Sequence, residues 1–335
     1  MKRFKIFCSI AFLLLLAACG TEKEQGNSND SDTLTVYTTV YPLSDFAEKI
    51  GGEYVETESI YPPGTDEHTF EPSQKDMMDL SDADVFFYIG LGLEGFVDKA
   101  EEVLQNENVK MIATGSELEG SLESDEGHEG HAEEEDHEEH AHEGDTEESE
   151  QGEEGHGHDH DINPHVWLDP VYAKELAHTI YESLSEQMPE KESVFKENYE
   201  NLVSQLDELD ESFETTAANA ETKKIFVAHA AYSYWEQRYG IEEVAISGIS
   251  SSDEPSQQEL KKIIDDAKKH NISYIIFEQN GSSRLTEVVQ KEIGAKKLTL
   301  HNLGVRTQED IDGDKDYFDL MNENIETLQK ALGSE

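Results

Sequence analysis

Histidine side chains carry most of the metal-binding chemistry in this sequence. The stretch from Gly155 to Pro170 reads GHGHDHDINPHVWLDP, so a histidine-rich acidic tract ends there and an apolar segment begins. His165 stands at this junction, directly before a Val-Trp pair and a Leu-Asp-Pro sequence that is typical of a helix start. A histidine at a folded junction, downstream of a solvated histidine tract, indicates one ordered metal site that the tract supplies.

The acidic tract from Glu123 to Asp161 contains 19 acidic residues and no lysine or arginine. We expect the segment from Glu117 to Asp161 to be disordered without metal, because it lacks hydrophobic periodicity and cannot bury enough apolar surface to fold. Its histidines would bind Zn²⁺ weakly, either as a collector for the ordered site or as an incidental property of a solubilising spacer. These auxiliary candidates are His128, His131, His137, His140, His142, His156, His158 and His160.

The N-terminus is predicted to be a lipoprotein signal peptide over residues 1–18. A positively charged start precedes an apolar run, Ile6 to Leu16, that is too short to span a bilayer. The following Ala-Ala-Cys sequence predicts cleavage before Cys19 and lipidation of its sulfur, which would anchor the protein on the extracytoplasmic face of the cell membrane. An ordinary secretory peptide with an incidental cysteine is the alternative. Residues 19–32 are polar and are expected to form a flexible tether.

Composition restricts both the partners and the metal ligands. The net charge of −51 argues against a nucleic-acid partner. The only cysteines are Cys8, which would leave with the signal peptide, and Cys19. A metal site in the mature chain must therefore use His, Asp and Glu side chains.

Strands alternate with helices on both sides of a long helical segment. This pattern predicts an α/β protein with two parallel-sheet lobes joined by a rigid helix. We expect the metal site in the cleft between the lobes. In the first lobe, a strand is expected from Leu34 to Tyr41, ending at Pro42. The expected divisions are an N-terminal lobe over residues 33–188 with the disordered loop at 117–161, a linking helix at 189–218 and a C-terminal lobe over 219–335.

Ligand sites in open α/β sheets collect beyond the carboxyl ends of the strands. His229 follows a predicted strand in the second lobe, and Glu278 follows another. His68 lies on a loop after the second strand of the first lobe, and His165 lies in the same lobe. Three imidazoles and a carboxylate suit tetrahedral Zn²⁺ better than Mn²⁺, which prefers more oxygen ligands.

Each of these residues also has an ordinary structural explanation, and spacing alone does not single out the four. His68 could be a solvated loop residue, and His165 could be a packed, hydrogen-bonded one. Asp169 is a candidate for orienting a ligand ring. The remaining histidines, His178, His270 and His301, are interpreted as surface or structural residues.

The chain resembles the solute-binding lipoproteins of bacterial zinc ABC importers, within the wider family of zinc- and manganese-binding proteins. The resemblance runs from Leu34 to about Leu332. It is carried by six segments: Thr38–Pro42 (TTVYP), His68–Ser73 (HTFEPS), Gly92–Glu94 (GLE), Asn163–Pro170 (NPHVWLDP), His229–Tyr234 (HAAYSY) and Ile275–Glu278 (IIFE).

The resemblance implies that His68, His165 and His229 are imidazole ligands of Zn²⁺ and that Glu278 is the carboxylate ligand. It also implies a monomer that hands its metal to a membrane permease driven by a cytoplasmic ATPase, and a mobile histidine loop near the site. Glu67 departs from the family, in which many members have proline before the first histidine, and it could compete as a ligand. No further metal-binding domain is expected after the second lobe.

Three other functions compete with zinc delivery. A third histidine disfavours a manganese-binding member, because manganese members typically have a carboxylate at the position of His229. A zinc hydrolase would use Glu278 as a general base, but His137-Glu-Glu-His140 lacks the His-Glu-x-x-His spacing of such enzymes, and we expect no enzyme activity. A surface adhesin is the third alternative and could coexist with transport.

Overall fold

The structure is a computed structural model that describes residues 33–126, 162–280 and 283–334. These residues belong to one compact unit, Thr33–Glu335. The predicted signal peptide, the predicted tether, the predicted lipidation site Cys19 and the eight histidines of the acidic tract lie outside the described residues.

The first lobe contains a four-stranded parallel sheet in the order β2-β1-β3-β4. Its strands are rich in β-branched and aromatic residues, and β3 is buried along its whole length, as expected for a central strand covered on both faces. The elements of this lobe are β1 (Leu34–Thr38), α1 (Tyr41–Gly51), η1 (Gly52–Tyr54), β2 (Val55–Ser59), α2 (Gln74–Ser81), β3 (Val85–Tyr88), α3 (Val97–Leu104), β4 (Lys110–Ala113), η2 (Ser116–Leu118) and α4 (Glu119–Glu126).

The second lobe repeats this topology, with a parallel sheet in the order β6-β5-β7-β8. Each sheet has one point at which the strand order reverses, between β1 and β3 in the first lobe and between β5 and β7 in the second. Ligands bind at such points in open α/β sheets. The elements are β5 (Lys224–Val227), α7 (Ser233–Tyr239), β6 (Glu242–Ala245), α8 (Gln257–Lys269), β7 (Tyr274–Glu278), α9 (Arg284–Ile293), β8 (Lys296–Leu300), α10 (Gln308–Asp312) and α11 (Tyr317–Leu332).

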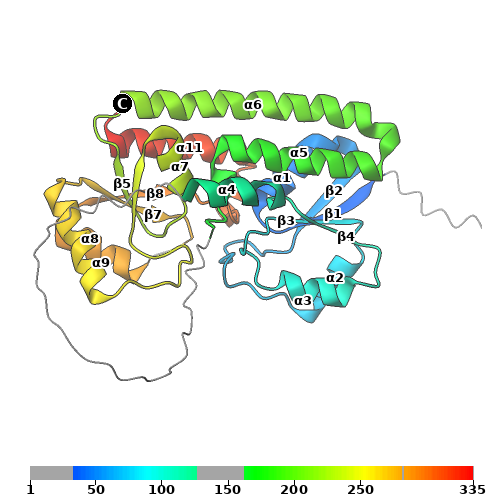
Figure 1. Ribbon diagram of the computed structural model, residues 1–335, viewed down its shortest axis with the longest axis horizontal. Coiled ribbons are helices and arrows are strands. Elements are labelled where there is room, and N and C mark those ends of the chain that lie inside the picture. The colour runs from blue at the N-terminus through cyan, green and yellow to red at the C-terminus, as the bar shows by residue number, and fades with distance from the viewer. Residues whose placement is uncertain (1–32, 127–161, 281–282, 335) are drawn as a thin grey trace, which may run out of the picture. The chain divides into compact units, whose positions relative to one another are not determined.

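Helix α6 (Glu192–Asn219) joins the two lobes. It follows α5 (Pro170–Gln187) and the short η4 (Pro189–Lys191), and its 28 residues span about 42 Å at 1.5 Å per residue. Its buried side chains, such as Leu202, Leu206 and Leu209, follow the helical repeat, so one stripe of the helix faces the protein. Figure 1 shows α6 extending over both sheets, and it contacts α1 of the first lobe and α11 of the second. The predicted two-lobed α/β fold with a long connecting helix is confirmed.

The segment before α5 is held between the lobes by buried aromatic residues. Trp167, in η3 (Val166–Leu168), is fully buried, and Tyr317 Oη donates a hydrogen bond of 2.8 Å to its carbonyl oxygen. Trp235 Nε1, in the second lobe, donates to the carbonyl oxygen of Leu168 at 2.8 Å. These two bonds tie the segment of His165, which precedes α5, to α7 and α11 of the second lobe.

Two sequence predictions were wrong at element boundaries. The first strand ends at Thr38 and not at Tyr41, because Pro42 lies in the first turn of α1, where its missing N–H costs nothing. The disordered tract was expected to begin at Glu117, but η2 and α4 continue the ordered chain to Glu126. Leu118 and Leu122, four residues apart and both buried, provide the apolar contact that the polar composition of this segment conceals.

Candidate metal centre

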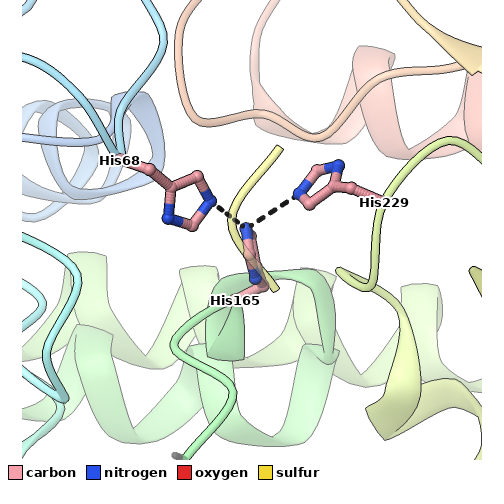
Figure 2. A group of neighbouring side chains, drawn as sticks. All are labelled: His68, His165 and His229. Atoms are coloured by element: carbon pink, nitrogen blue, oxygen red, sulfur yellow. Dashed lines mark hydrogen bonds between the residues drawn. The ribbon is translucent and has the colours of Figure 1, made fainter. Parts of the chain in front are cut away.

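Three histidines from distant parts of the chain converge between the lobes. His68 lies on the loop between β2 and α2, His165 directly precedes η3, and His229 follows β5. Figure 2 shows their rings pointing toward one another, with His165 between the other two. Among the described residues, these three form a group of side chains that could hold a metal ion, with ligand atoms all within 4.8 Å of one another.

Two of the separations among the three Nε2 atoms match the coordination of one zinc ion. Nε2 of His165 lies 3.1 Å from Nε2 of His68 and 3.3 Å from Nε2 of His229. Zinc–nitrogen bonds of about 2.05 Å at tetrahedral angles place neighbouring ligand nitrogens about 3.3 Å apart. The two measured separations are therefore close to the edges of a zinc coordination tetrahedron.

The neighbours of these rings determine which nitrogens carry protons. Nδ1 of His165 lies 2.7 Å from Oδ1 of Asn163, which can only accept, so Nδ1 carries the proton and Nε2 has a lone pair. Oε1 of Glu278 lies against Nδ1 of His229, which gives His229 the same tautomer. The Nδ1 atoms of both rings are thus held by oxygen acceptors, and their Nε2 atoms face each other at 3.3 Å at the centre of the group.

Burial favours the neutral, metal-binding form of two of these rings. Complete burial, together with the nearby His229 and His68, lowers the pKa of His165 well below its usual value. Burial also lowers the pKa of His68. Burial opposes the charged form of His229 as well, but the adjacent Glu278 carboxylate outweighs it and raises the pKa of His229.

Glu278 lies at the end of β7 and lines the same cavity as His68 and His229. This cavity has a volume of about 250 Å³, and residues of both lobes surround it. The Glu278 carboxylate contacts Nδ1 of His229, whereas Nε2 of the same ring faces the other two histidines. Glu278 is therefore not part of the three-histidine group. The cavity is thus lined by two of the three converging imidazoles, His68 and His229, and by the Glu278 carboxylate that orients His229.

Asn163 is a site residue that the sequence analysis did not identify. Its Oδ1 accepts from the backbone N–H of His165 at 3.1 Å as well as from the ring, and its Nδ2 donates to the carbonyl oxygen of Ala230 (3.0 Å) and to Oγ of Ser233 (2.9 Å). It therefore links the segment of His165 to the loop that follows His229. The only signal in the sequence is its position two residues before His165, within the Asn-Pro-His motif.

Asp169 does not orient a ligand ring, contrary to the suggestion from the sequence. It caps α5, with Oδ1 accepting from the backbone N–H groups of Val171 (2.8 Å) and Tyr172 (3.1 Å), and its Oδ2 pairs with Arg238 of α7. Asp169 is fully buried, so this pair joins the lobes behind the site.

Glu67 is buried beside the site without joining the histidine group. Its Oε1 accepts a hydrogen bond of 2.9 Å from Nδ2 of Asn302, in the second lobe. Burial raises the pKa of Glu67 to about 7. The carboxylate of Glu67 thus bonds across the lobe interface, one residue away from the ligand ring of His68.

The other three described histidines lie away from the centre, as their interpretation as surface or structural residues predicts. His178 lies on α5 and His270 caps the C-terminus of α8; both are partly exposed, and each pairs with an acidic side chain four residues away. His301 is buried, and its Nε2 lies 3.1 Å from Oδ2 of Asp310.

Comparisons with known proteins agree with this geometry. The family model described as "ZnuA: Zinc-uptake complex component A periplasmic" matches residues 36–331. The zinc-binding lipoprotein AdcA of Streptococcus pneumoniae is 34% identical over all of this chain, which spans 62% of that relative's length. The high-affinity zinc uptake system protein ZnuA of Bacillus subtilis is 33% identical over 98% of this chain and 97% of its own length.

A solved structure has the same fold. The crystal structure of the Zn(II)-bound ZnuA-like domain of Streptococcus pneumoniae AdcA matches with a TM-score of 0.68 and 30% identity, over 90% of this chain and 100% of that one. Within the described ranges, this protein has no helix that is long and apolar enough to cross a membrane.

Proposed function

Because the chain belongs to the family of zinc-uptake complex component A, we propose that it captures one Zn²⁺ outside the cytoplasm and delivers it to an ABC importer. The observation that carries this proposal is the convergence of three Nε2 atoms, two of whose separations match the edges of a zinc tetrahedron, with Nδ1 of His165 held by Asn163 and Nδ1 of His229 held by Glu278. Imidazole nitrogens at this spacing bind zinc without help from sulfur, which suits a chain whose two cysteines lie near its N-terminus.

The proposed ligands are His68, His165 and His229, each through Nε2, with Glu278 at the fourth position. Since Glu278 contacts Nδ1 of His229 on the far side of the ring, it must turn toward the three Nε2 atoms to coordinate the ion. If it stays on His229, it acts as an orienting carboxylate and the fourth position is left to water. Removal of the carboxylate weakens binding in both cases.

The partners are proposed on the same basis. The zinc-loaded protein docks on the permease of an importer whose cytoplasmic ATPase drives transport, and it acts as a monomer held at the extracytoplasmic face of the cell membrane by lipid on Cys19. The eight auxiliary histidines collect Zn²⁺ weakly around the site. The family is one of solute-binding proteins, and we expect zinc to be cargo here, without peptidase or other hydrolytic turnover.

Calorimetric titration of residues 20–335 with Zn²⁺ and with Mn²⁺ tests this function. A matched variant replaces the eight auxiliary histidines by glutamine and keeps the chain length. We expect one tight zinc site in both proteins, with weaker zinc sites only in the wild type. Loss of the tight site in the variant would move the binding site to the tract, and tighter binding of Mn²⁺ would overturn the choice of metal.

A further inference from the structure

Asn302 connects three segments that each carry a proposed zinc ligand. It follows β8 in the second lobe and is 5% exposed. Its side-chain Nδ2 donates to Oε1 of Glu67 at 2.9 Å, and Glu67 immediately precedes His68. The first link therefore crosses from the second lobe to the loop of the first lobe that carries a ligand.

The second and third links reach the segments that carry Glu278 and His165. The backbone N–H of Asn302 donates to Oε1 of Gln279 at 3.0 Å, and Nε2 of Gln279 donates to Oδ1 of Asn302 at 2.8 Å. Gln279 immediately follows Glu278. The carbonyl oxygen of Asn302 accepts from Nε1 of Trp167 at 2.7 Å, two residues after His165.

The orientation of the Asn302 amide follows from its partners. Oδ1 accepts from the backbone N–H of Gly304 at 3.0 Å, and this group can only donate. Nδ2 faces the carboxylate of Glu67. Turning the amide over would place N–H against N–H and oxygen against oxygen, so one orientation satisfies all of these groups.

Gly304 shows how closely Glu67 is packed into this arrangement. A Cβ atom at Gly304 would lie 2.5 Å from Oε1 and 2.6 Å from Cδ of Glu67, which is far inside van der Waals contact. The carboxylate thus occupies the space that a side chain at position 304 would need. Burial, packing and the hydrogen bond from Asn302 together leave Glu67 little freedom to move.

We propose that Asn302 is a positioning residue that holds the ligand segments of the two lobes at the spacing zinc requires. This inference rests on the proposed function. A loosened contact between Asn302 and Glu67 would let the loop of His68 move away from His165 and His229, so zinc would dissociate faster. Asn302 acts on the ligands indirectly, through its hydrogen bonds to Glu67, Gln279 and Trp167.

Exchange of donor and acceptor tests the contact. Asn302→Asp at pH 8 puts a second carboxylate against Glu67, and we expect the zinc Kd to rise at least about tenfold. Glu67→Gln still accepts from Asn302 and should change the Kd less than about threefold. In the double variant the new amide at position 67 can donate to the new carboxylate at position 302, so the Kd should return to within about threefold of the wild type.

Two further variants separate positioning from general stability. Asn324→Asp is the matched control, because Asn324 is also buried and its side-chain amide pairs with the backbone of His301. It should lower the Tm of the zinc-free protein without changing the Kd by more than about threefold. Glu67→Ala removes the same contact without adding a charge, and it should raise the Kd even if Asn302→Asp does not fold.

The outcomes distinguish this inference from the proposed function. Three results would each overturn the role of Asn302. The first is a double variant that binds zinc as weakly as Asn302→Asp, and the second is a Glu67→Ala variant that binds zinc like the wild type. The third is an Asn324→Asp variant that binds zinc as weakly as Asn302→Asp. A wild-type protein that binds no zinc would refute the proposed function. The same cycle of wild type, two single variants and the double variant, measured by the Tm of zinc-free protein, would then still show whether Asn302 and Glu67 join the lobes.

Discussion

Replacement of Asn163 by alanine should weaken zinc binding, and this loss should be separable from its effect on the stability of the fold. The change removes the acceptor for Nδ1–H of His165 at 2.7 Å and the donor to the carbonyl oxygen of Ala230 at 3.0 Å. The ring of His165 would then be free to rotate and to change tautomer. Loss of such an orienting partner typically costs about 10–100-fold in metal affinity, or about 1.4–2.8 kcal/mol of binding free energy.

Asn163→Asp provides the matched control for this experiment. It keeps an oxygen for Nδ1 of His165, but it loses the donor to Ala230, so both variants give up about 1–3 kcal/mol of unfolding free energy. Competition with a chelating dye measures the Kd, and urea unfolding of zinc-free protein measures stability. We expect the aspartate variant to keep most of the affinity that the alanine variant loses. Wild-type affinity in Asn163→Ala, or equal losses in both variants, would refute the reasoning.

Three other predictions follow from contacts in and around the site. Zinc at about 100 times its Kd should raise the unfolding free energy by about 2.7 kcal/mol, and His229→Ala should abolish that shift in a thermal melt; an unchanged shift would exclude His229 as a ligand. Glu278→Gln should raise the zinc Kd at least about tenfold in the dye competition, because it removes the carboxylate from His229; an unaltered Kd would contradict both proposed roles. Arg238→Ala should lower the free energy of unfolding in urea by about 3 kcal/mol, since it leaves the buried Asp169 carboxylate without its cation. Arg238→Lys should lower it less. Equal stability of the wild type and both variants would show that the pair contributes nothing to stability.

Local patterns in the sequence were enough to predict the fold. Alternating strands and helices predict two parallel sheets, and apolar residues every three or four positions predict the long helix. The positions of His229 and Glu278 after strands place them at the edge where ligand sites form, and the structure has both lining one cavity. Local signals failed where a tertiary contact decides, as at α4, which the buried Leu118 and Leu122 hold to the first lobe.

The residues that support the histidines could not be found in the same way. Asn302 lies 235 positions from Glu67, and neither residue has a periodicity or a motif that points to the other. Asp169 was a candidate for orienting a ring, but its oxygens bind the N-terminus of α5 and Arg238 instead. Hydrogen bonds between buried polar groups depend on orientation and distance, which sequence spacing does not fix.

The most direct test of the central claim is a crystal structure of the zinc-loaded protein with anomalous scattering data collected above and below the zinc absorption edge. The account predicts one strong zinc peak about 2.0–2.1 Å from Nε2 of His68, His165 and His229. A peak bound by fewer than these three nitrogens, or the tightest zinc elsewhere in the molecule, would contradict it.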